Sequence, residues 1–408
     1  MTGPAGTAPA VAPVVPEAPP FGRDRRVQLW AATAAVSQAG DVAWAVALAW
    51  TATRLAGPAE AGLVIGAGTA PRAVVTLYGG ALADRLDPRR VMVVANLGRV
   101  LVLVAAIAAS TYRGVSVPEL LAVAVLFGVF DAVYNPAGMT LPRQMVRAED
   151  LPRSAALFQI GRRVATFVGA PVGGFLVAVG DLRAVMAVDA ASFLLISVFL
   201  ATALRPRFPR PPASGGSVRA GLAAGFRYLR DEVRVRTLVV SLTGLNLFVG
   251  PALAVGVALH VHASGWGATT LGLSEAAVGV GAGLGAAATL RWRAVNPFRT
   301  GLLVLVGQAA AIAVLGFTSR PALLLAAAVI GVTAGVASAQ LSGAFQALVD
   351  PSYLGRMGAL TSLGDDVLMP VAMAGFGALA ASAGLPAACL VTGALFAVLV
   401  LWSATRAV

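Results

Sequence analysis

Apolar segments of about twenty residues or more recur along this chain, and short polar turns separate them. A helix needs about 20 residues to cross the roughly 30 Å hydrocarbon core of a membrane. The pattern therefore predicts an all-α membrane protein. We place twelve spanning helices at residues 28–53, 60–83, 91–112, 118–138, 154–179, 182–204, 237–261, 270–290, 300–318, 321–347, 357–381 and 386–404.

One longer polar segment, residues 205–236, divides these helices into two groups of six. It begins with a stretch rich in Pro, Arg and Gly, which is typical of a linker. Leu222, Phe226 and Leu229 then share one helical face, which predicts an amphipathic helix on the inner leaflet or, alternatively, a solvated linker helix. The expected domains are a disordered cytoplasmic tail over 1–26, two pseudo-symmetric bundles over 27–204 and 237–408, and this cytoplasmic linker.

Pairs of glycines four residues apart indicate close packing between the predicted helices. Residues at this spacing lie on one helix face, and small side chains there allow a neighbouring backbone to approach in lipid. Glycine is common in this chain, so some of the pairs are expected to be coincidental. The pairs are Gly62 and Gly66, Gly169 and Gly173, Gly281 and Gly285, and Gly331 and Gly335.

The composition agrees with a membrane protein and predicts its topology. Of 408 residues, 58% are hydrophobic and only 12% are charged, whereas the charged share in soluble domains is about a quarter. The net charge of +12 comes entirely from arginine, which sits in the turns between helices rather than on one nucleic-acid-binding face. Placing both termini in the cytoplasm puts most arginines inside, as expected for a multi-pass protein of the inner (plasma) membrane.

The chemistry of soluble enzymes is absent from the sequence. No phosphate-binding loop occurs, and the chain has no lysine to complete one, which excludes a fused ATPase and leaves a proton or ion gradient as the energy source. The sequence also contains no cluster of metal ligands and no nucleophile with a partner base. We therefore expect no enzymatic activity, no cofactor and no metal.

A basic loop lies at the end of the second apolar segment, with the sequence Gly79-Gly80-Ala81-Leu82-Ala83-Asp84-Arg85-Leu86-Asp87-Pro88-Arg89-Arg90. Its glycines, its acid–arginine pair and its trailing arginines resemble the signature loop of the major facilitator superfamily. Segments 131–137, 141–142, 169–174 and 189–193 resemble the exporter branch that includes the enterobactin exporter and macrolide-efflux-type proteins. The resemblance implies a transporter with a cytoplasmic gate at Gly80, Asp84, Arg85, Arg89 and Arg90, in which the loop acid fastens the two halves together.

The exporter branch often carries a glycine- and proline-rich motif in the fifth helix. The corresponding residues here are Gly169, Pro171, Gly173 and Gly174, with the proline one place later than usual. A proline removes a backbone hydrogen bond and bends a helix. The motif therefore favours export over import, although a simple packing kink is the alternative interpretation.

Charged residues within the apolar segments are the best candidates for function, because each is costly unless it is paired or faces water. A proton-coupled antiporter needs a carboxylate that binds a proton in one state and releases it in another. Asp41 and Asp131 are the first candidates, and the adjacent Asp365 and Asp366 are further ones. Glu275 ranks lower because we expect it close to the outer surface.

Two arginines within the apolar segments, Arg72 and Arg99, are the expected charge partners of these carboxylates. Arg72 lies at a depth that matches Asp41, so these two residues are expected to pair. An interhelical salt bridge without a role in transport is the alternative for most of these charges.

These features together predict a secondary active transporter, a proton-coupled antiporter of the efflux and multidrug-resistance type. Its cargo is expected to be a small amphipathic organic molecule such as a drug, siderophore or secondary metabolite. The expected partners are this cargo, protons and membrane lipids, with no nucleic acid, and the protein is expected to be a monomer. The alternatives are an importer of a sugar or other metabolite, and a membrane receptor or scaffold without transport. Candidates for lining the cavity are Trp44, Tyr78, Tyr134, Asn135, Asn246 and Gln340.

Overall fold

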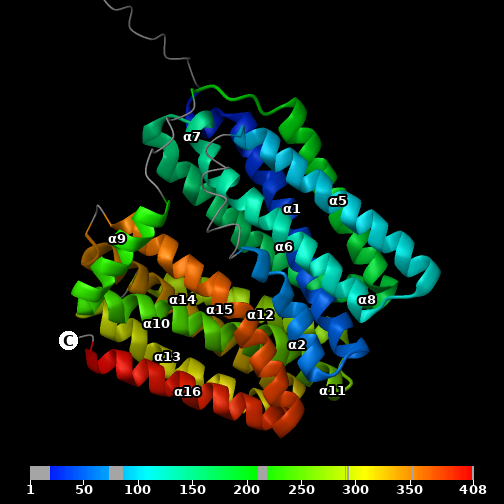
Figure 1. The fold of residues 1–408 in the computed structure, drawn as a ribbon, viewed down its shortest axis with the longest axis vertical. Helices are drawn as coiled ribbons and strands as arrows, with labels where there is room; N and C mark the ends of the chain where they lie inside the picture. Colours follow the sequence, from blue (N-terminus) through cyan, green and yellow to red (C-terminus); the bar gives the residue numbers. More distant parts are fainter. Residues whose placement is uncertain are drawn as a thin grey trace, which may run out of the picture.

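The computed structural model describes residues 19–72, 86–209, 218–289, 291, 294–350 and 353–406. Helices account for most of these residues, and no strand occurs within these ranges. Figure 1 shows the helices in two groups, one containing α1, α2, α5, α6 and α8 and the other containing α10 to α16. The predicted all-α class is confirmed.

The first bundle contains the helices that come before the linker. A break inside its longest helix, α8, lies at Gly180 and Asp181, where Asp181 has a φ of 63°. The break separates the predicted fifth and sixth spans. The elements are η1 (Phe21–Arg23), α1 (Arg25–Leu55), α2 (Pro58–Ala67), α5 (Pro88–Arg113), α6 (Val117–Thr140), α7 (Pro142–Met145), η2 (Ala148–Asp150) and α8 (Leu151–Thr202).

The second bundle contains the helices that follow the linker, and its first span includes a short π-helix, η3, between α10 and α11. Within the described residues, nine helices are long and apolar enough to cross a membrane. One of the nine contains both halves of α8, and α1 and α2 lie at the first two predicted spans, so the fold of twelve spans is confirmed. The elements are α10 (Val233–Pro251), η3 (Ala252–Val257), α11 (Ala258–Ala263), α12 (Ala268–Thr289), α13 (Pro297–Val314), η4 (Leu315–Phe317), α14 (Arg320–Leu348), α15 (Leu354–Ala383) and α16 (Leu385–Arg406).

Several helices begin three or four residues before the predicted apolar segments because polar caps extend them. Asp24, Asp87 and Asn296 each accept hydrogen bonds from backbone N–H groups in the first turn of α1, α5 and α13. Such caps satisfy donors that have no partner within the helix. The hydrophobic pattern marks the part of each helix that lies in the membrane, and the caps mark where the helix starts.

All four glycine pairs lie where two helices cross. Gly62 and Gly66 of α2 lie against α15, and Gly169 and Gly173 of α8 lie against the backbone of α1. Gly281 and Gly285 of α12 lie against the face of α14 that carries Gly331 and Gly335. Glycines from both helices therefore lie at the same helix crossing. A Cβ atom at any of these positions would overlap a neighbouring atom, which is the close approach that small residues permit.

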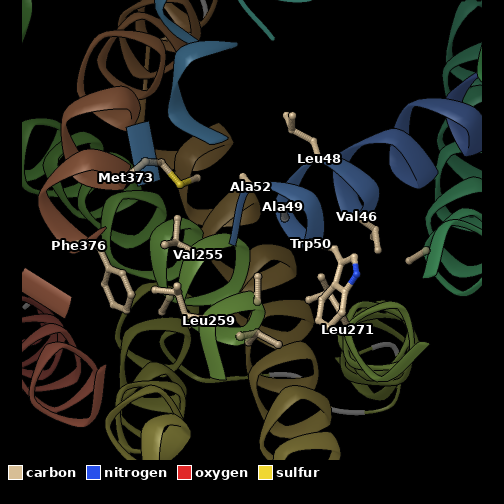
Figure 2. Packing of buried hydrophobic residues seen from close by; sticks show 14 of the residues in the cluster. Val46, Leu48, Ala49, Trp50, Ala52, Val255, Leu259, Leu271, Met373 and Phe376 are labelled. Atoms are coloured by element: carbon tan, nitrogen blue, oxygen red, sulfur yellow. The ribbon is translucent and has the colours of Figure 1, made fainter. Parts of the chain in front are cut away.

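Among the described residues, the apolar core that joins the two bundles lies toward one end of the molecule. The largest apolar core combines Trp50 of α1 and Leu271 of α12 with Val255, Leu259 and Phe376, so it draws on both bundles (Figure 2). Two smaller cores each stay within one bundle, the first around Met145 and Leu200 and the second around Val239 and Met357. We name the end with the shared core the closed end, and the end with α7 and α9 the wide end, where the bundles diverge (Figure 1).

The predicted amphipathic helix is α9 (Val218–Asp231), and it packs against the second bundle rather than lying free. The ring of Tyr228 stacks on Tyr353 with centroids 4.3 Å apart, and its hydroxyl accepts a hydrogen bond of 3.1 Å from the backbone N–H of Asp350. Leu229 joins the same core, whereas Phe226 is 59% exposed. Part of the expected apolar face is therefore used for docking onto the protein.

The predicted disordered tail, residues 1–26, includes structured residues at its end. Residues 1–18 lie outside the described residues, but η1 and the first residues of α1 are helical. Asp24 anchors this segment because both of its carboxylate oxygens accept hydrogen bonds from the Arg207 guanidinium, which follows α8. The sequence pattern missed the anchor because its partner is far away in the chain.

The pKa of Asp24 reflects this anchor. Burial of the carboxyl raises its pKa, but the hydrogen bonds and charge of Arg207, together with backbone donors, outweigh burial and lower the pKa overall. The pKa of Asp24 is lower in the folded protein than in the unfolded chain, where it is about 3.9. The Asp24–Arg207 pair therefore stabilises the fold fully when the pH is above that unfolded pKa, and this stabilisation is lost as the pH falls through the lower folded pKa.

Replacing Arg207 with alanine is expected to lower the midpoint of thermal unfolding by about 2–8 °C at neutral pH. The variant leaves the Asp24 carboxylate buried without its counter-ion, at a cost of about 1–3 kcal/mol. Thermal unfolding of the purified protein measures the shift, with the exposed Arg205→Ala as a control. Equal midpoints of thermal unfolding for Arg207→Ala and Arg205→Ala would contradict the claim that the Asp24–Arg207 pair stabilises the fold.

Candidate functional site

Asp131 of α6 lies between two guanidinium groups within the first bundle. Its Oδ2 accepts a hydrogen bond from Arg72 Nη2, and its Oδ1 accepts one from Arg99 Nη2. Arg72 follows α2 and Arg99 lies in the middle of α5, so three segments converge on one carboxylate. Each oxygen of Asp131 thus has its own cationic partner.

Arg99 is buried, with a side chain that is only 2% exposed. Its Nη1 donates a hydrogen bond of 3.0 Å to Asn96 Oδ1, one turn earlier in α5. Its guanidinium carbon lies 4.8 Å from the ring centroid of Tyr134 and 5.0 Å from that of Phe193, which is cation–π geometry. A carboxylate, an amide and two aromatic rings therefore compensate the buried charge.

Asp41 and Asp189 complete this group of charges. Asp41 is partly exposed, and in the described part of the chain no donor lies within hydrogen-bonding distance of its carboxylate. Asp189 is fully buried, and its Oδ1 accepts a hydrogen bond of 3.2 Å from Ser192. Both carboxylates lie close enough to Arg99 to interact with it electrostatically, and also with each other.

We name Asp41, Arg72, Arg99, Asp131 and Asp189 the central charge cluster. It holds three carboxylates and two guanidiniums, so it has one negative charge in excess when all five side chains are ionised. A group of this kind can exchange a proton. A bound proton removes the excess negative charge, and the arginines can change which carboxylates they pair with.

The predicted pairing of Asp41 with Arg72 is not formed, because Arg72 pairs with Asp131 instead. The cause is the packing of α6 against the segment after α2. Gly128 of α6 lies so close to the backbone of Gly68 that a Cβ atom would overlap it. Asp131 follows Gly128 by nearly one turn and is thereby brought to Arg72.

Asp365, one of the two adjacent carboxylates of the second bundle, does not join the central charge cluster. Asp365 of α15 accepts a hydrogen bond of 2.7 Å from Asn246 of α10 through its Oδ2. Its Oδ1 is buried and has no hydrogen-bond partner within the described residues. The sequence candidates therefore form two separate sites, and Asp365 connects α10 with α15.

The candidates for lining the cavity differ in their surroundings. Trp44 is 5% exposed and packs on Phe127 with ring centroids 5.4 Å apart, so it belongs to the core and not to an open cavity. Tyr134 packs against Arg99, and Gln340 is buried in α14. Asn135 is exposed, Asn246 binds Asp365, and Tyr78 lies outside the described residues.

Part of the predicted cytoplasmic gate also lies outside the described residues, namely Gly80, Asp84 and Arg85. Arg89 donates hydrogen bonds to the carbonyl oxygens of Leu200 and Ala201 at the end of α8. A cation there is favourable because helix C-termini carry partial negative charge. Arg89 thus joins two helices of the first bundle, and the latch between halves stays a prediction. Arg90 lies at the surface beside Asp87.

The predicted fifth-helix motif lies at the junction of both bundles. Gly169 and Gly173 lie against α1, whereas Gly174 lies against Gly272 of α12 in the second bundle. Pro171 is inside α8 between these contacts. The motif therefore packs one helix against two others, and its link to the direction of transport stays a prediction.

A cavity of about 500 Å³ opens at the closed end, beside the break in α8. It is lined by residues of α1, α8 and the start of α12, and it contains none of the carboxylates of the central charge cluster. The cavity marks a junction of the bundles rather than the place where proton exchange is expected. Its lining residues are Trp50, Arg54, residues 177–181, Gly267 and Ala268.

Sequence reasoning missed the groups that hold Arg99 in place. Asn96 precedes Arg99 by one turn in an otherwise apolar stretch of α5, which is a signal that could have identified it. Phe193 offers no such signal, because an aromatic residue in an apolar helix is ordinary. Only the packing of α8 against α5 brings its ring to the guanidinium.

Comparison with known proteins gives matches over most of the chain. The family model described as Major Facilitator Superfamily matches residues 29–372. The multidrug efflux pump Tap of Mycolicibacterium fortuitum is 30% identical over 222 residues, which cover 52% of this chain and 54% of Tap. This chain thus spans about half the length of Tap. An uncharacterized MFS-type transporter, YfiS of Bacillus subtilis (strain 168), is 24% identical over 395 residues, which cover 93% of this chain and 92% of YfiS.

Solved structures share the fold at low sequence identity. The nucleoside transporter NupG has a TM-score of 0.70 at 13% identity, covering 92% of this chain and 98% of NupG. A D-xylose–proton symporter has a TM-score of 0.70 at 13% identity, covering 93% of this chain and 96% of the symporter. A bacterial homolog of the human lysosomal transporter Spinster, inward-facing and occupied, has a TM-score of 0.69 at 15% identity, covering 94% and 96%.

Proposed function

Because this chain belongs to the major facilitator superfamily, we propose that it is a proton-coupled exporter of small amphipathic organic molecules that works by alternating access. The partial match to a relative named as a multidrug efflux pump supports export. A nucleoside transporter and a D-xylose–proton symporter share the fold, but their likeness is below 25% identity and concerns the fold alone. We further propose that the exporter acts as a monomer in the plasma membrane.

The observation that carries the proposal is the excess carboxylate of the central charge cluster. Three carboxylates and two guanidiniums leave one negative charge uncompensated in a medium where charges are costly. A proton on Asp41 removes that cost, and Arg99 stays paired with Asp131. When water reaches Asp41, the carboxylate is solvated and the proton leaves, which couples proton movement to the change of state.

The arrangement of the bundles supports an inward-open state. Basic residues gather at the wide end, near η1, α7 and α9, whereas few arginines lie at the closed end. Short loops rich in arginine face the cytoplasm, so the wide end is the cytoplasmic end and both termini are inside. If the wide end closes and the two bundles separate at the shared core, the protein reaches the outward-open state, as alternating access requires.

Transport into proteoliposomes with an imposed pH gradient tests the proposal. An antiporter accumulates cargo in vesicles with an acidic lumen, because protons leave as cargo enters. A proton-coupled importer accumulates cargo in vesicles with an alkaline lumen instead. The probes are a panel of cationic and neutral amphiphiles, and protein-free liposomes correct for passive trapping. Accumulation in alkaline vesicles would favour the importer, and no movement of any probe would contradict transport coupled to protons.

A further inference from the structure

The side of α9 that turns away from the second bundle carries an aromatic ring among arginines. Gly225 lies against Leu360 of α15, so the side of the helix that carries Gly225 is docked. Phe226 is 59% exposed, and Arg227 and Arg230 are exposed next to it. Phe226 and Arg230 are four residues apart and therefore share one side of the helix. We name the surface formed by Phe226, Arg227 and Arg230 the α9 basic face.

The position of α9 holds this face at the membrane surface. One residue, Glu232, separates α9 from the membrane-spanning segment Val233–Ala263. Tyr228 stacks on Tyr353 and keeps the helix against the protein, so α9 does not extend away from the membrane. The helix lies at the wide end, which the proposed orientation places in the cytoplasm (Figure 1). The α9 basic face is therefore at the level of the headgroups of the inner leaflet.

A hydrogen bond places the last turn of α9 beside an exposed side of α10. Val233, Arg236 and Val240 are exposed, and their spacing of three and four residues puts them on one side of α10. Exposed valines on a spanning helix are expected to meet lipid chains. Arg236 Nη1 donates a hydrogen bond of 3.1 Å to the backbone carbonyl oxygen of Arg230 in α9. The last turn of α9 thus lies beside the surface of α10 that meets lipid.

The charges of this region favour an anionic partner. Residues 227–236 include four arginines and two adjacent acids, at 231 and 232, so the formal net charge of the segment is +2. Arg227 and Arg230 form no ion pair within the described residues. A cytosolic protein with an acidic surface would also match the charge. The exposed ring of Phe226, next to the lipid-facing side of α10, favours lipid instead.

We propose that the α9 basic face binds the phosphate groups of anionic phospholipids in the inner leaflet. The guanidiniums of Arg227 and Arg230 donate hydrogen bonds to phosphate oxygens, and the ring of Phe226 enters the layer between the headgroups. Bound lipid then holds α9, which packs on α10 and α15, at the membrane surface. This partner lies outside the proposed transport function, and its binding requires neither cargo nor protons.

Arginine modification in lipid nanodiscs tests the proposal on the unmodified protein. The reagent p-hydroxyphenylglyoxal modifies accessible guanidiniums, and mass spectrometry measures the rate at each arginine. Arg227 and Arg230 are expected to react at least about fivefold more slowly in phosphatidylglycerol nanodiscs than in phosphatidylcholine nanodiscs. Arg113 is exposed at the outer end of α5 and meets the same lipids, so it serves as the control. Its rate is expected to change by less than about twofold.

A spin label tests the same contact from the side of the lipid. Cys389 is the single cysteine of the chain and is buried. The substitutions Cys389→Ala and Ala223→Cys direct the label to an exposed position that lies about one turn before Phe226. In phosphatidylglycerol vesicles the label is expected to be at least about threefold less accessible to a water-soluble nickel complex than in phosphatidylcholine vesicles.

Charge variants of the labelled protein identify the groups responsible. Arg227→Gln together with Arg230→Gln is expected to abolish the difference between the two lipids. The matched pair Arg113→Gln and Arg320→Gln removes two exposed arginines at the outer ends of α5 and α14 and is expected to preserve it.

Equal modification of Arg227 and Arg230 in both lipids, or equal protection of Arg113, would overturn the proposal. A nickel accessibility that does not depend on lipid charge would overturn it as well, and it is the result expected if the face binds an acidic soluble protein. A lipid-dependent difference that persists without both arginines would reject their role. Neither measurement uses cargo or a gradient, so failure here leaves the proposed transport function intact.

Discussion

Arg99→Met is expected to abolish transport and to lower the midpoint of thermal unfolding by about 10 °C. Arg99 is buried and forms an ion pair with Asp131. It also interacts electrostatically with Asp41 and Asp189 without contacting them. Its removal leaves three carboxylates with Arg72 as their remaining cation, and breaking a buried pair in this way costs about 3–5 kcal/mol. Thermal unfolding of the purified protein and transport in proteoliposomes measure the two effects.

The matched control is Arg162→Met, which removes an exposed arginine of α8 that binds Gln159. We expect little change in either measurement for this variant. The double variant Arg99→Met with Asp131→Asn restores the charge balance, so we expect it to regain stability but not transport. Full transport by Arg99→Met would contradict a central role for this arginine, and a double variant as unstable as the single one would contradict the charge argument.

Asp41→Asn is expected to reduce gradient-driven transport to about a tenth or less while preserving the fold. Asparagine has nearly the same size as aspartate, and Asp41 has no hydrogen-bonding partner to lose among the described residues. The variant cannot bind and release a proton, so the coupling step is lost. Exchange of labelled for unlabelled cargo across the membrane needs no net proton movement and is expected to persist.

The control for Asp41 is Asp131→Asn, which removes the carboxylate that both arginines bind. We expect this variant to lose stability as well as transport, because Arg72 and Arg99 lose their shared partner. A pH profile separates the two roles. Exchange by Asp41→Asn is expected to be independent of pH, and a profile identical to that of the unmodified protein would contradict the assignment.

The number and order of spans could be predicted from the sequence because membrane thickness fixes the length of each apolar segment. The break at Gly180 and Asp181 falls where the sequence separates two spans, and the start of α5 differs only by the cap at Asp87. The docking of α9 could not be predicted, since Tyr228 meets Tyr353 from a distant part of the chain.

The candidate site was only partly predictable for a related reason. Sequence position gives the depth of a residue along a helix, but the direction in which a side chain points depends on how the helices pack. The matching depths of Asp41 and Arg72 suggested that these two residues pair. In the structure, Gly128 of α6 packs against the backbone of the segment after α2, and Arg72 pairs with Asp131 instead.

The direction of proton movement during cargo efflux tests the central claim most directly. Proteoliposomes are loaded with cargo and a pH-sensitive dye, at equal pH on both sides, and cargo then flows out down its own gradient. Proton-coupled antiport predicts that the lumen acidifies with the unmodified protein and that Asp41→Asn produces no pH change. A lumen that becomes alkaline, or cargo efflux without any proton movement in the unmodified protein, would contradict the account.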